Sequence, residues 1–502
     1  MMPVPDQAKH RHSGSAAALT PLDAPCASLD ESSQLDTKST SGPGNLSHYP
    51  HAPAKASRPN IPSISNLTSL SSIDGKPTSN ESPSAVCSPP WPDQYSHSPA
   101  FDEAIEKAAL ANSRSFPLQD VQEACLFRYF VEQISHWFDL CDEYRHFELV
   151  VPLRARQYPH LLDAMFAVAA RHLSRMPQYK TDNGIQYNGY TLPCLGDHVA
   201  VEYMLKCIPP LRQFHDSQDS SDYLDSIIAT AVILRQFEEI DHEDNAAADH
   251  DPRHQPHTPE KKVNFLAIID SVLRSLPTDA VFGGRSLMQA SYWMALRQEI
   301  YNSFTRKEPP RLILPLYFWH ISSGANKIVM HLVQAAQWRW GGGSDTEYLR
   351  LVRQQQDLED QVLTRFCPIY SRPADKSRGE IFPASWYASN VDTTTSQLGL
   401  IAKAFLIAEN PFMTAGSAAS EAASRAQWRK SECQVRTLLL QLCGVALSHT
   451  ASPPALIQAV LGIGLYGDFF IDNYERQAIR SVVERTRDTH AWPVHHLLEM
   501  FK

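Results

Sequence analysis

Four histidines in one polar stretch are the clearest metal-binding candidates in this sequence. They stand among aspartates in EEIDHEDNAAADHDPRHQPHTPEKK, and they are His242, His250, His254 and His257. Imidazole and carboxylate groups are ligands of zinc and nickel, so this composition could hold such an ion loosely. Their spacing is irregular and prolines interrupt it, which leaves the ligands unorganised. We therefore interpret the stretch near residues 241–260 as a disordered insert between two helices, and we predict no metal site there.

Three further candidates for chemistry have simpler structural explanations. His172 lies on the apolar face of a predicted helix at 161–176, where a core histidine bonded to one acceptor is commoner than a base or ligand. The glycines of WGGGSDTEYL lack the lysine and the preceding strand of a phosphate loop. We interpret them as a flexible turn before Ser344, a residue suited to cap a helix. Cys125 and Cys141 lie on aromatic-rich helices without an adjacent base.

No catalytic set emerges from the remaining residues. The chain has no G-x-S-x-G motif, and no pair of carboxylates is set off by its surroundings as an acid and a base. The sequence therefore predicts a protein that is not an enzyme and that has no catalytic residues, no cofactor and no resident metal. The residues that would contact a ligand or effector are unknown at this level.

Charge and cysteine content exclude several classes of protein. In 502 residues, 45 basic and 55 acidic side chains give a net charge of −10, so the chain does not coat nucleic acid by bulk charge. Its 9 cysteines are scattered and form no C-x-x-C pair, which indicates reduced thiols in the cytosol or nucleus. No signal-peptide pattern and no run of about twenty apolar residues is present. We expect a soluble intracellular protein without a membrane segment.

The composition changes near residue 115. Before it the chain is rich in Ser, Pro, Asn and His and has no sustained apolar period, so it cannot bury enough surface to offset chain entropy. We predict a long disordered N-terminal tail at 1–115 and a large helical domain at 116–502. The Ser-Pro pairs at Ser88 and Ser98 are candidates for phosphorylation, although a linker is the simpler interpretation.

Apolar periodicity predicts helices throughout the second part. The stretch QEACLFRYFVEQISHWFDLCDEYRHF, 122–147, reads as one amphipathic helix. Its apolar face is formed by Leu126, Phe130, Ile134, Trp137 and Cys141. The stretch PHLLDAMFAVAARHLSRM, 159–176, is apolar nearly all round, and its alanines permit close contact between helices. We expect it to be a central buried helix.

Further helices follow the same pattern. We predict them near 196–208, 221–237, 263–275, 284–305, 317–338, 345–365, 394–409, 418–446, 454–467, 472–487 and 493–501. RLILPLYF is the one stretch that suggests a strand, but its proline argues against a position in a sheet. Without a series of strands or a fixed repeat period, the sequence predicts an all-α fold.

The stretch SYWMALRQEIYNSFTRKEPPRL, 291–312, places a charge next to an apolar stripe. At 100° per residue the stripe is formed by Trp293, Leu296, Ile300 and Phe304. Arg297 lies at the edge of the stripe, while Glu299 is predicted to lie well away from it and Gln298 to be on the opposite surface. We interpret Arg297 as a half-buried polar anchor that sends its guanidinium to a carbonyl or carboxylate.

Four segments of the chain resemble a known family. They are LFRYFVEQISHWFDLCDEYRHFELVVPLRARQYPHLLDAMFAVAARHLSR, SYWMALRQEIYNSFTRKEPPRL, CGVALSHTASPPALIQAVLGIGLYGDFFIDNYERQAI and HAWPVHHLLEMF. Their order and spacing, from about residue 118 to 502, are similar to the fungal-specific transcription factor domain, the middle homology region of fungal zinc-cluster regulators. The resemblance implies a helical regulatory domain. It places Trp293, Arg297, Gln298, Glu299 and Tyr301 on a recurring helix that serves the fold and its regulation rather than catalysis.

The chain departs from the family in its DNA-binding half. A binuclear zinc cluster needs six cysteines followed by a basic linker, whereas Cys26 and Cys87 are the only cysteines before the helical domain. We therefore do not expect direct sequence-specific DNA binding. A regulator that works through a partner, a coding sequence that lacks an upstream exon, and a helical domain reused for another task all remain open.

Two classes of function are compatible with these features. The first is a nuclear transcriptional regulator whose helical domain receives an effector or a partner, with the transcription machinery or a DNA-binding regulator as protein partners and a homodimer left open. The alternative is a helical small-molecule-binding protein or an enzyme that reuses the same scaffold, because a fold alone does not set function. The family resemblance and the absence of catalytic motifs favour the regulator.

Overall fold

The computed structural model describes residues 114–213, 221–241, 265–275, 286–312, 314–413, 421–450 and 453–502. The predicted tail at 1–115 lies outside the described residues except for its last two positions, and the predicted insert at 241–260 lies outside them except for Asp241. The histidines proposed as weak metal ligands, and Ser88 and Ser98, therefore also lie outside the described part.

Helices dominate the described residues, which confirms the predicted all-α class. The predicted ranges from 159–176 onward each correspond to a helix, with most ends shifted by a few residues. The range 317–338 is the exception, because a 3₁₀ turn occupies Leu316–His320 and the α-helix begins only at Gly324. In chain order the α-helices are α2 (Val121–Tyr129), α3 (His146–Leu149), α4 (Val151–Arg154), α5 (Pro159–Arg175), α6 (Asp197–Gln213), α7 (Ser221–Ile240), α9 (Phe265–Ser275), α11 (Leu287–Arg306), α12 (Gly324–Trp340), α13 (Asp345–Gln361), α14 (Asn390–Ala408), α15 (Glu421–Ser448), α16 (Pro453–Tyr466), α17 (Asn473–His490) and α18 (His495–Met500).

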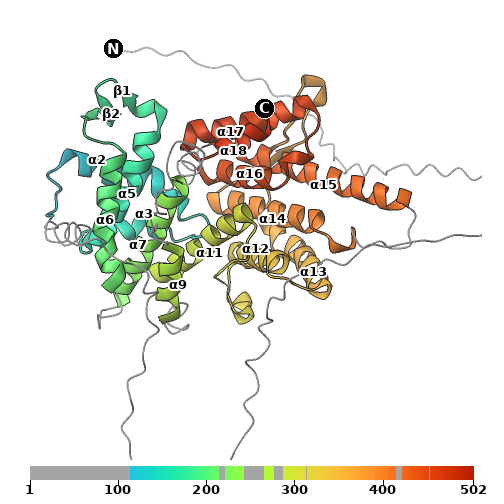
Figure 1. The fold of residues 1–502 in the computed structure, drawn as a ribbon, viewed down its shortest axis with the longest axis horizontal. Coiled ribbons are helices and arrows are strands. Elements are labelled where there is room, and N and C mark those ends of the chain that lie inside the picture. The colour runs from blue at the N-terminus through green and yellow to red at the C-terminus, as the bar shows by residue number, and fades with distance from the viewer. Residues whose placement is uncertain are drawn as a thin grey trace, which may run out of the picture. The chain divides into compact units, whose positions relative to one another are not determined.

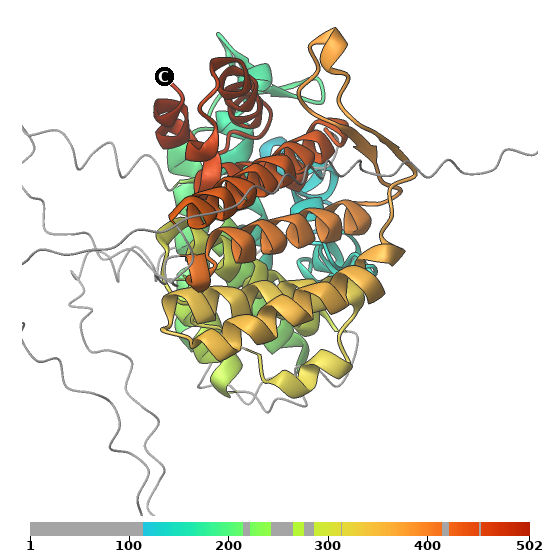
Figure 2. The same ribbon diagram turned by 90° about the vertical axis from the view of Figure 1, so that its right-hand side faces the viewer.

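The helices form two groups that α11 joins (Figure 1). In the first group, α5 packs against α2, α6 and α7, and α7 packs against α9. In the second, α12 packs against α13 and α14, and α14, α15 and α16 all pack against one another. Figure 2 shows this group from the side, with α12 to α15 in yellow to orange. Helix α11 contacts α7 of the first group and both α12 and α16 of the second. A residue of α11 therefore has neighbours from both halves of the described chain.

Helix α5 is the buried centre of the first group, as its composition predicts. Ala164, Ala167, Ala169 and Ala170 are fully buried, and the apolar residues on every side of the helix are buried with them. Small side chains let α6 and α7 approach closely, because the distance between helix axes depends on the side chains at the contact.

The prediction of one regular helix at 122–147 was wrong. Helix α2 ends at Tyr129, a π-helical turn follows at Phe130–Ile134, and a 3₁₀ turn follows at Ser135–Trp137. All five predicted core residues are nevertheless buried. Leu126, Phe130 and Ile134 recur every four residues, which is more than the 3.6 of an α-helix, and the wider π turn keeps them on one side.

Two small antiparallel sheets among the described residues were not predicted. The first has three strands, β1 (Lys180–Thr181), β2 (Gly184–Tyr187) and β3 (Tyr190–Leu192), and the second is a hairpin of β4 (Tyr370–Arg372) and β5 (Ala384–Trp386). Asn188 and Gly189, which join β2 to β3, have φ values of 48° and 80°. A two-residue turn with both φ values positive is the type that Asn-Gly favours, so the sequence carried this signal.

The stretch RLILPLYF forms no strand among its described residues, as predicted. Its second half belongs to a 3₁₀ turn at Leu316–His320. None of the helices in the described part of the chain combines the length and the apolar character needed to cross a bilayer.

Candidate functional site

Arg297 is held by the protein, which confirms its interpretation as a polar anchor. Its side chain is 7% exposed, and Nη2 donates to the carbonyl oxygen of Phe138 at 2.6 Å and contacts Sδ of Met294 at 3.2 Å. The predicted stripe beside it is buried. Phe138 belongs to the irregular segment after α2, so this bond joins α11 to a part of the chain that has no regular helix of its own.

The residue after Phe138 continues this junction. The carboxylate of Asp139 accepts N–H bonds of 2.9 Å from both Phe147 and Glu148, in the first turn of α3. Burial raises the pKa of Asp139 to about 7, although these bonds and the charge of Arg297 oppose the rise. Asp139 and Arg297 together therefore fix the turn between α2 and α3 from two sides.

Gln298 and Glu299 contradict their predicted exposure. Gln298 is 1% exposed and donates from Nε2 to the carbonyl oxygen of Val232 in α7 at 3.0 Å. Glu299 is fully buried and accepts the N–H of Arg311 at 2.6 Å. Their polarity suggested an outer face, but α7, α12 and α16 surround α11, so this helix has no outer face over these positions.

Five side chains, which we call the central cluster, join distant parts of the chain. They are Trp137, His172, Tyr301, His490 and Trp492. His172 Nε2 lies 3.0 Å from the carbonyl oxygen of His490, and Trp492 Nε1 donates to the hydroxyl of Tyr301 at 2.9 Å. The Trp137 ring lies against His172 and Trp492, with centroid distances of 5.0 and 6.0 Å.

His172 is a core histidine, as predicted. Because a carbonyl only accepts, Nε2 carries the proton, and Nδ1 accepts the hydroxyl of Tyr129 at 2.7 Å. Burial lowers the pKa of His172 to about 3, so the ring is neutral near pH 7. A neutral imidazole with both nitrogens bonded to the protein positions its neighbours and has no free lone pair for a reaction.

Two buried acids have raised pKa values, but both shift in the same direction, so they do not divide into an acid and a base. Burial raises the pKa of Glu239 in α7 to about 7, and the charge of Glu299 in α11 adds to the rise. Burial also raises the pKa of Glu299 itself. Nη2 of Arg235 lies 3.5 Å from Glu239. The sequence pattern does not indicate that these two acids are buried, because Glu239 lies in an acidic stretch typical of a solvent-exposed helix end.

Stability is expected to fall on acidification, because burial strongly lowers the pKa of several histidines. Burial lowers the pKa of four histidines to between about 3 and 4, and these are His160, His172, His331 and His490. Each binds its proton more tightly when unfolded, so its contribution is complete above about pH 6.5 and is lost as the pH falls.

Asp139 and Glu239 act in the opposite direction. Their folded-state pKa values are raised to about 7, so their contribution is lost as the pH rises from about 4 to 7. Burial also raises the pKa of Glu299 and of Asp225, so these two acids act in the same direction as Asp139 and Glu239. Because the pKa values of all four histidines fall to between about 3 and 4, we expect the histidines to outweigh the acids, and the urea midpoint should be modestly lower at pH 5 than at pH 7. An equal or higher midpoint at pH 5 would show that the acids dominate.

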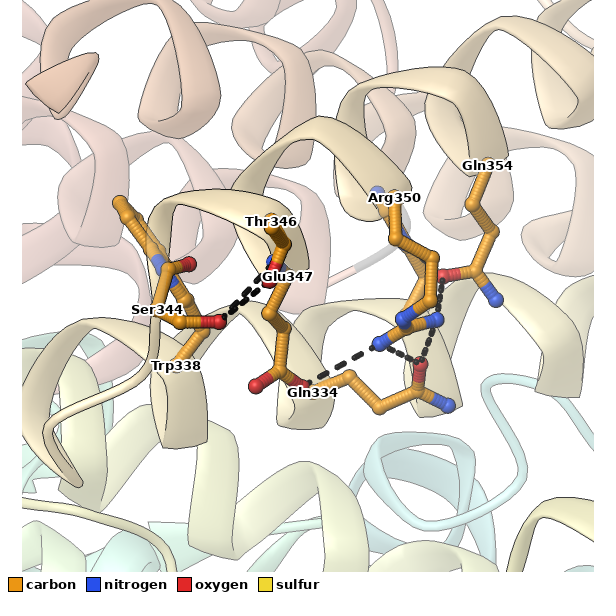
Figure 3. Close-up of polar contacts among 8 residues, drawn as sticks. Gln334, Trp338, Ser344, Thr346, Glu347, Arg350 and Gln354 are labelled. Carbon is orange, nitrogen blue, oxygen red and sulfur yellow. Dashed lines mark hydrogen bonds and ion pairs between the residues drawn. The ribbon is translucent and has the colours of Figure 1, made fainter. Parts of the chain in front are cut away.

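A polar network ties α13 to α12 (Figure 3). Arg350 donates through Nη1 and Nη2 to Oε1 of Gln334, at 3.1 Å for each bond, and through Nη1 to Oε1 of Gln354 at 3.2 Å. His331 Nδ1 lies 3.2 Å from the same Gln354 oxygen. The network is made of side chains that bond one another across two helices, so its role is to fix their packing.

The glycine-rich stretch beside this network is a turn and a helix cap, as predicted. Gly342 has a φ of 81°, which glycine adopts without steric cost. Ser344 accepts the N–H of Glu347 at its side chain, and its carbonyl accepts Trp338 Nε1 at 3.0 Å. These bonds account for the serine and for the turn.

An open groove lies on the other side of α14, where α14 and α15 meet. It has a volume of about 440 Å³, and we call it the α14/α15 groove. Its lining residues are Lys403, Ile407, Lys430, Cys433, Gln434, Thr437, Leu438 and Gln441. In sequence these residues look like ordinary solvated positions of two amphipathic helices, and only the packing of the helices brings them together.

The cysteines and histidines of the described residues gather into no metal centre. No group of three or more histidine, cysteine, aspartate or glutamate residues in the described ranges could hold a metal ion. Cys125 and Cys141 are buried, and burial raises the pKa of both thiols. A thiol with a raised pKa is a weak nucleophile, which agrees with their interpretation as core residues.

The four segments that carry the family resemblance meet around the central cluster. Arg297 of the second segment bonds Phe138 of the first, and His172 of the first bonds His490 of the fourth. Helix α16, in the third segment, packs against α11 and against the 3₁₀ turn that contains Trp137. Comparison of the chain with protein-family models, curated proteins and solved structures finds no match.

Proposed function

We propose that this protein is a fungal transcriptional regulator that acts in the nucleus through its helical domain and a protein partner, without a zinc-cluster module of its own. The observation that supports the proposal is the convergence of four resembling segments on one core. Side-chain bonds join the segments that begin near residues 126, 291 and 490, and the segment that begins near 443 packs against them through α16. They therefore behave as one structural unit.

The position of α11 suggests how such a domain would transmit a signal. Helix α11 bonds the first group of helices through Arg297 and Gln298, and it bonds the C-terminal segment through Tyr301. An effector or partner that shifts the second group must move α11 or strain these bonds, and coupling between sites requires an element of this kind. The proposed role of the domain is to receive a signal in one half and to report it in the other.

A second candidate function is favoured by one specific observation. The α14/α15 groove has the volume of a small-molecule site, which supports the alternative of a helical small-molecule-binding protein. The two candidates differ in the consequence of ligand binding. A regulator changes transcription when its ligand binds, whereas a carrier or an enzyme has no effect on a tethered promoter.

The proposal is tested by tethering. The full chain, fused to an unrelated DNA-binding module, should change the expression of a reporter that carries the matching operator in a fungal host. The module alone is the control. A fusion that enters the nucleus, accumulates to a normal level and leaves the reporter at the level of the control would contradict the proposal.

The unfused protein is expected to bind duplex DNA weakly and without sequence preference. Its net charge of −10 repels the phosphate backbone, and no recognition module is read in the sequence. An electrophoretic shift assay with specific and scrambled duplexes at about 150 mM salt measures this. Tight, salt-resistant and sequence-selective binding would show that the helical domain reads DNA directly.

A further inference from the structure

The lining of the α14/α15 groove comes from one face of each helix. On α14, Lys403 and Ile407 are four residues apart, and on α15 the lining runs at helical spacing from Lys430 to Gln441. Side chains at such spacing share a face, so the groove follows the seam between the two helices. Figures 1 and 2 show α14 and α15 side by side along this seam.

The charge of the groove has one sign. Two charged side chains line it, and both are lysines, Lys403 and Lys430. No carboxylate lines it. Lys403 is 42% exposed and forms an ion pair of 2.7 Å with Glu359 of α13, outside the lining. Lys430 is exposed and has no ion-pair partner among the described residues. One lysine is therefore partly neutralised, the other is free to pair, and the groove attracts an anion.

Beside these charges the groove offers an apolar surface and hydrogen-bonding groups. Ile407 and Leu438 are half-buried and present aliphatic surface from the two helices. The side chains of Gln434 and Gln441 are exposed at the lining and can bond a polar substituent. The hydroxyl of Thr437 donates to the carbonyl of Cys433 at 2.8 Å, so towards a ligand it acts as an acceptor.

We propose that the α14/α15 groove binds a small amphipathic anion, with its acidic group between Lys403 and Lys430 and its apolar body against Ile407 and Leu438. A volume of about 440 Å³ lies within the range of small-molecule sites. An acidic group gains from Lys430 and from Lys403, whose charge Glu359 partly neutralises, and the aliphatic body gains from leaving water.

This inference deepens the proposed function, and its regulatory meaning rests on that function, whereas binding itself does not. Helix α15 packs against α16, and α16 packs against α11, so the groove is connected to the central cluster through two helix contacts. A ligand that wedges α14 from α15 would act on the element that joins both halves. The groove is thus the receiving site of the proposed signal.

Cys433 supplies a direct reporter of occupancy. Its thiol lines the groove and is exposed, while Cys194 and Cys367 are exposed elsewhere. Decanoate is the probe, and decyltrimethylammonium is the matched cation with the same chain. Alkylation of each cysteine by N-ethylmaleimide is followed by peptide mass spectrometry of the full-length protein. At about ten times its dissociation constant, decanoate should slow alkylation of Cys433 about tenfold and leave Cys194 and Cys367 unchanged.

Charge reversal provides the decisive variants. Lys403→Glu with Lys430→Glu should abolish protection by decanoate and create protection by decyltrimethylammonium. Lys430→Glu alone breaks no ion pair of the described residues. It should weaken the binding of decanoate at least about threefold. Equal protection of Cys433 by both probes, or no saturable protection by decanoate, would overturn the inference, as would equal slowing at all three cysteines.

The reporter assay separates this inference from the proposed function. If decanoate does not protect Cys433 but the tethered fusion still changes reporter expression, the proposed binding site is wrong and the proposed regulator is not affected. If decanoate protects Cys433 but the tethered fusion leaves the reporter at the level of the control, the proposed regulator is wrong and the proposed binding site is not affected. The experiment therefore assigns each failure to one of the two proposals.

Discussion

Replacing Arg297 with alanine is expected to lower the free energy of unfolding by about 2–4 kcal/mol. The substitution removes a side chain that is 7% exposed and leaves the buried carbonyl of Phe138 without its donor. Nε and Nη1 of Arg297 have no hydrogen-bond partner, and their burial offsets part of the gain from Nη2. We therefore expect a loss nearer about 2 than 4 kcal/mol, measured by urea denaturation and thermal melting.

Arg306→Ala is the matched control, because it makes the same substitution in the last turn of the same helix at an exposed position. Its cost should stay within about 0.5 kcal/mol. Gln298→Ala does not serve this purpose, since Gln298 is buried and bonds Val232. A melting temperature of Arg297→Ala equal to that of Arg306→Ala would contradict the anchor. Loss of the regulatory response at an unchanged melting temperature would instead indicate contact with an effector.

Gly444→Ala should destabilise the protein although alanine favours helices. A Cβ atom at Gly444, within α15, would lie far inside contact distance of the carbonyl oxygen of Pro383, just before β5. The oxygen belongs to the backbone and cannot rotate away, so α15 or the hairpin has to shift. Overpacking of this kind costs typically about 1–3 kcal/mol and exceeds the gain in helix propensity.

Gly464→Ala is the matched control, because the change in the free energy of unfolding should have the opposite sign. Gly464 lies in α16, and a Cβ there would meet only Leu497 Cδ2 at 3.6 Å, an ordinary contact. Alanine should therefore raise the free energy of unfolding by about 0.5 kcal/mol through helix propensity and added contact. Opposite signs for the two glycines, read from urea midpoints, are the expected result. Two changes of the same sign would show that propensity rather than packing controls both positions.

Apolar periodicity within single elements determined much of the fold. The helices from α5 to α18 follow from it, and so does the burial of Leu126, Trp293 and Phe304, because a repeat of about 3.6 residues is a local property. The turn and cap at Ser344 are also local, since a serine bonds N–H groups two or three residues away. The hairpin of β2 and β3 could have been predicted from Asn188 and Gly189 by the same kind of reasoning.

Tertiary structure decided which polar residues are buried and which residues form a site. Gln298 and Glu299 are polar, as surface residues usually are, but they are buried. Their burial depends on how many neighbouring helices surround α11. His172 bonds the carbonyl of a residue 318 positions away, which no local pattern encodes. The α14/α15 groove likewise exists only because two separately amphipathic helices meet along one seam. Periodicity states which face of a helix is apolar, whereas long-range packing sets what each face meets.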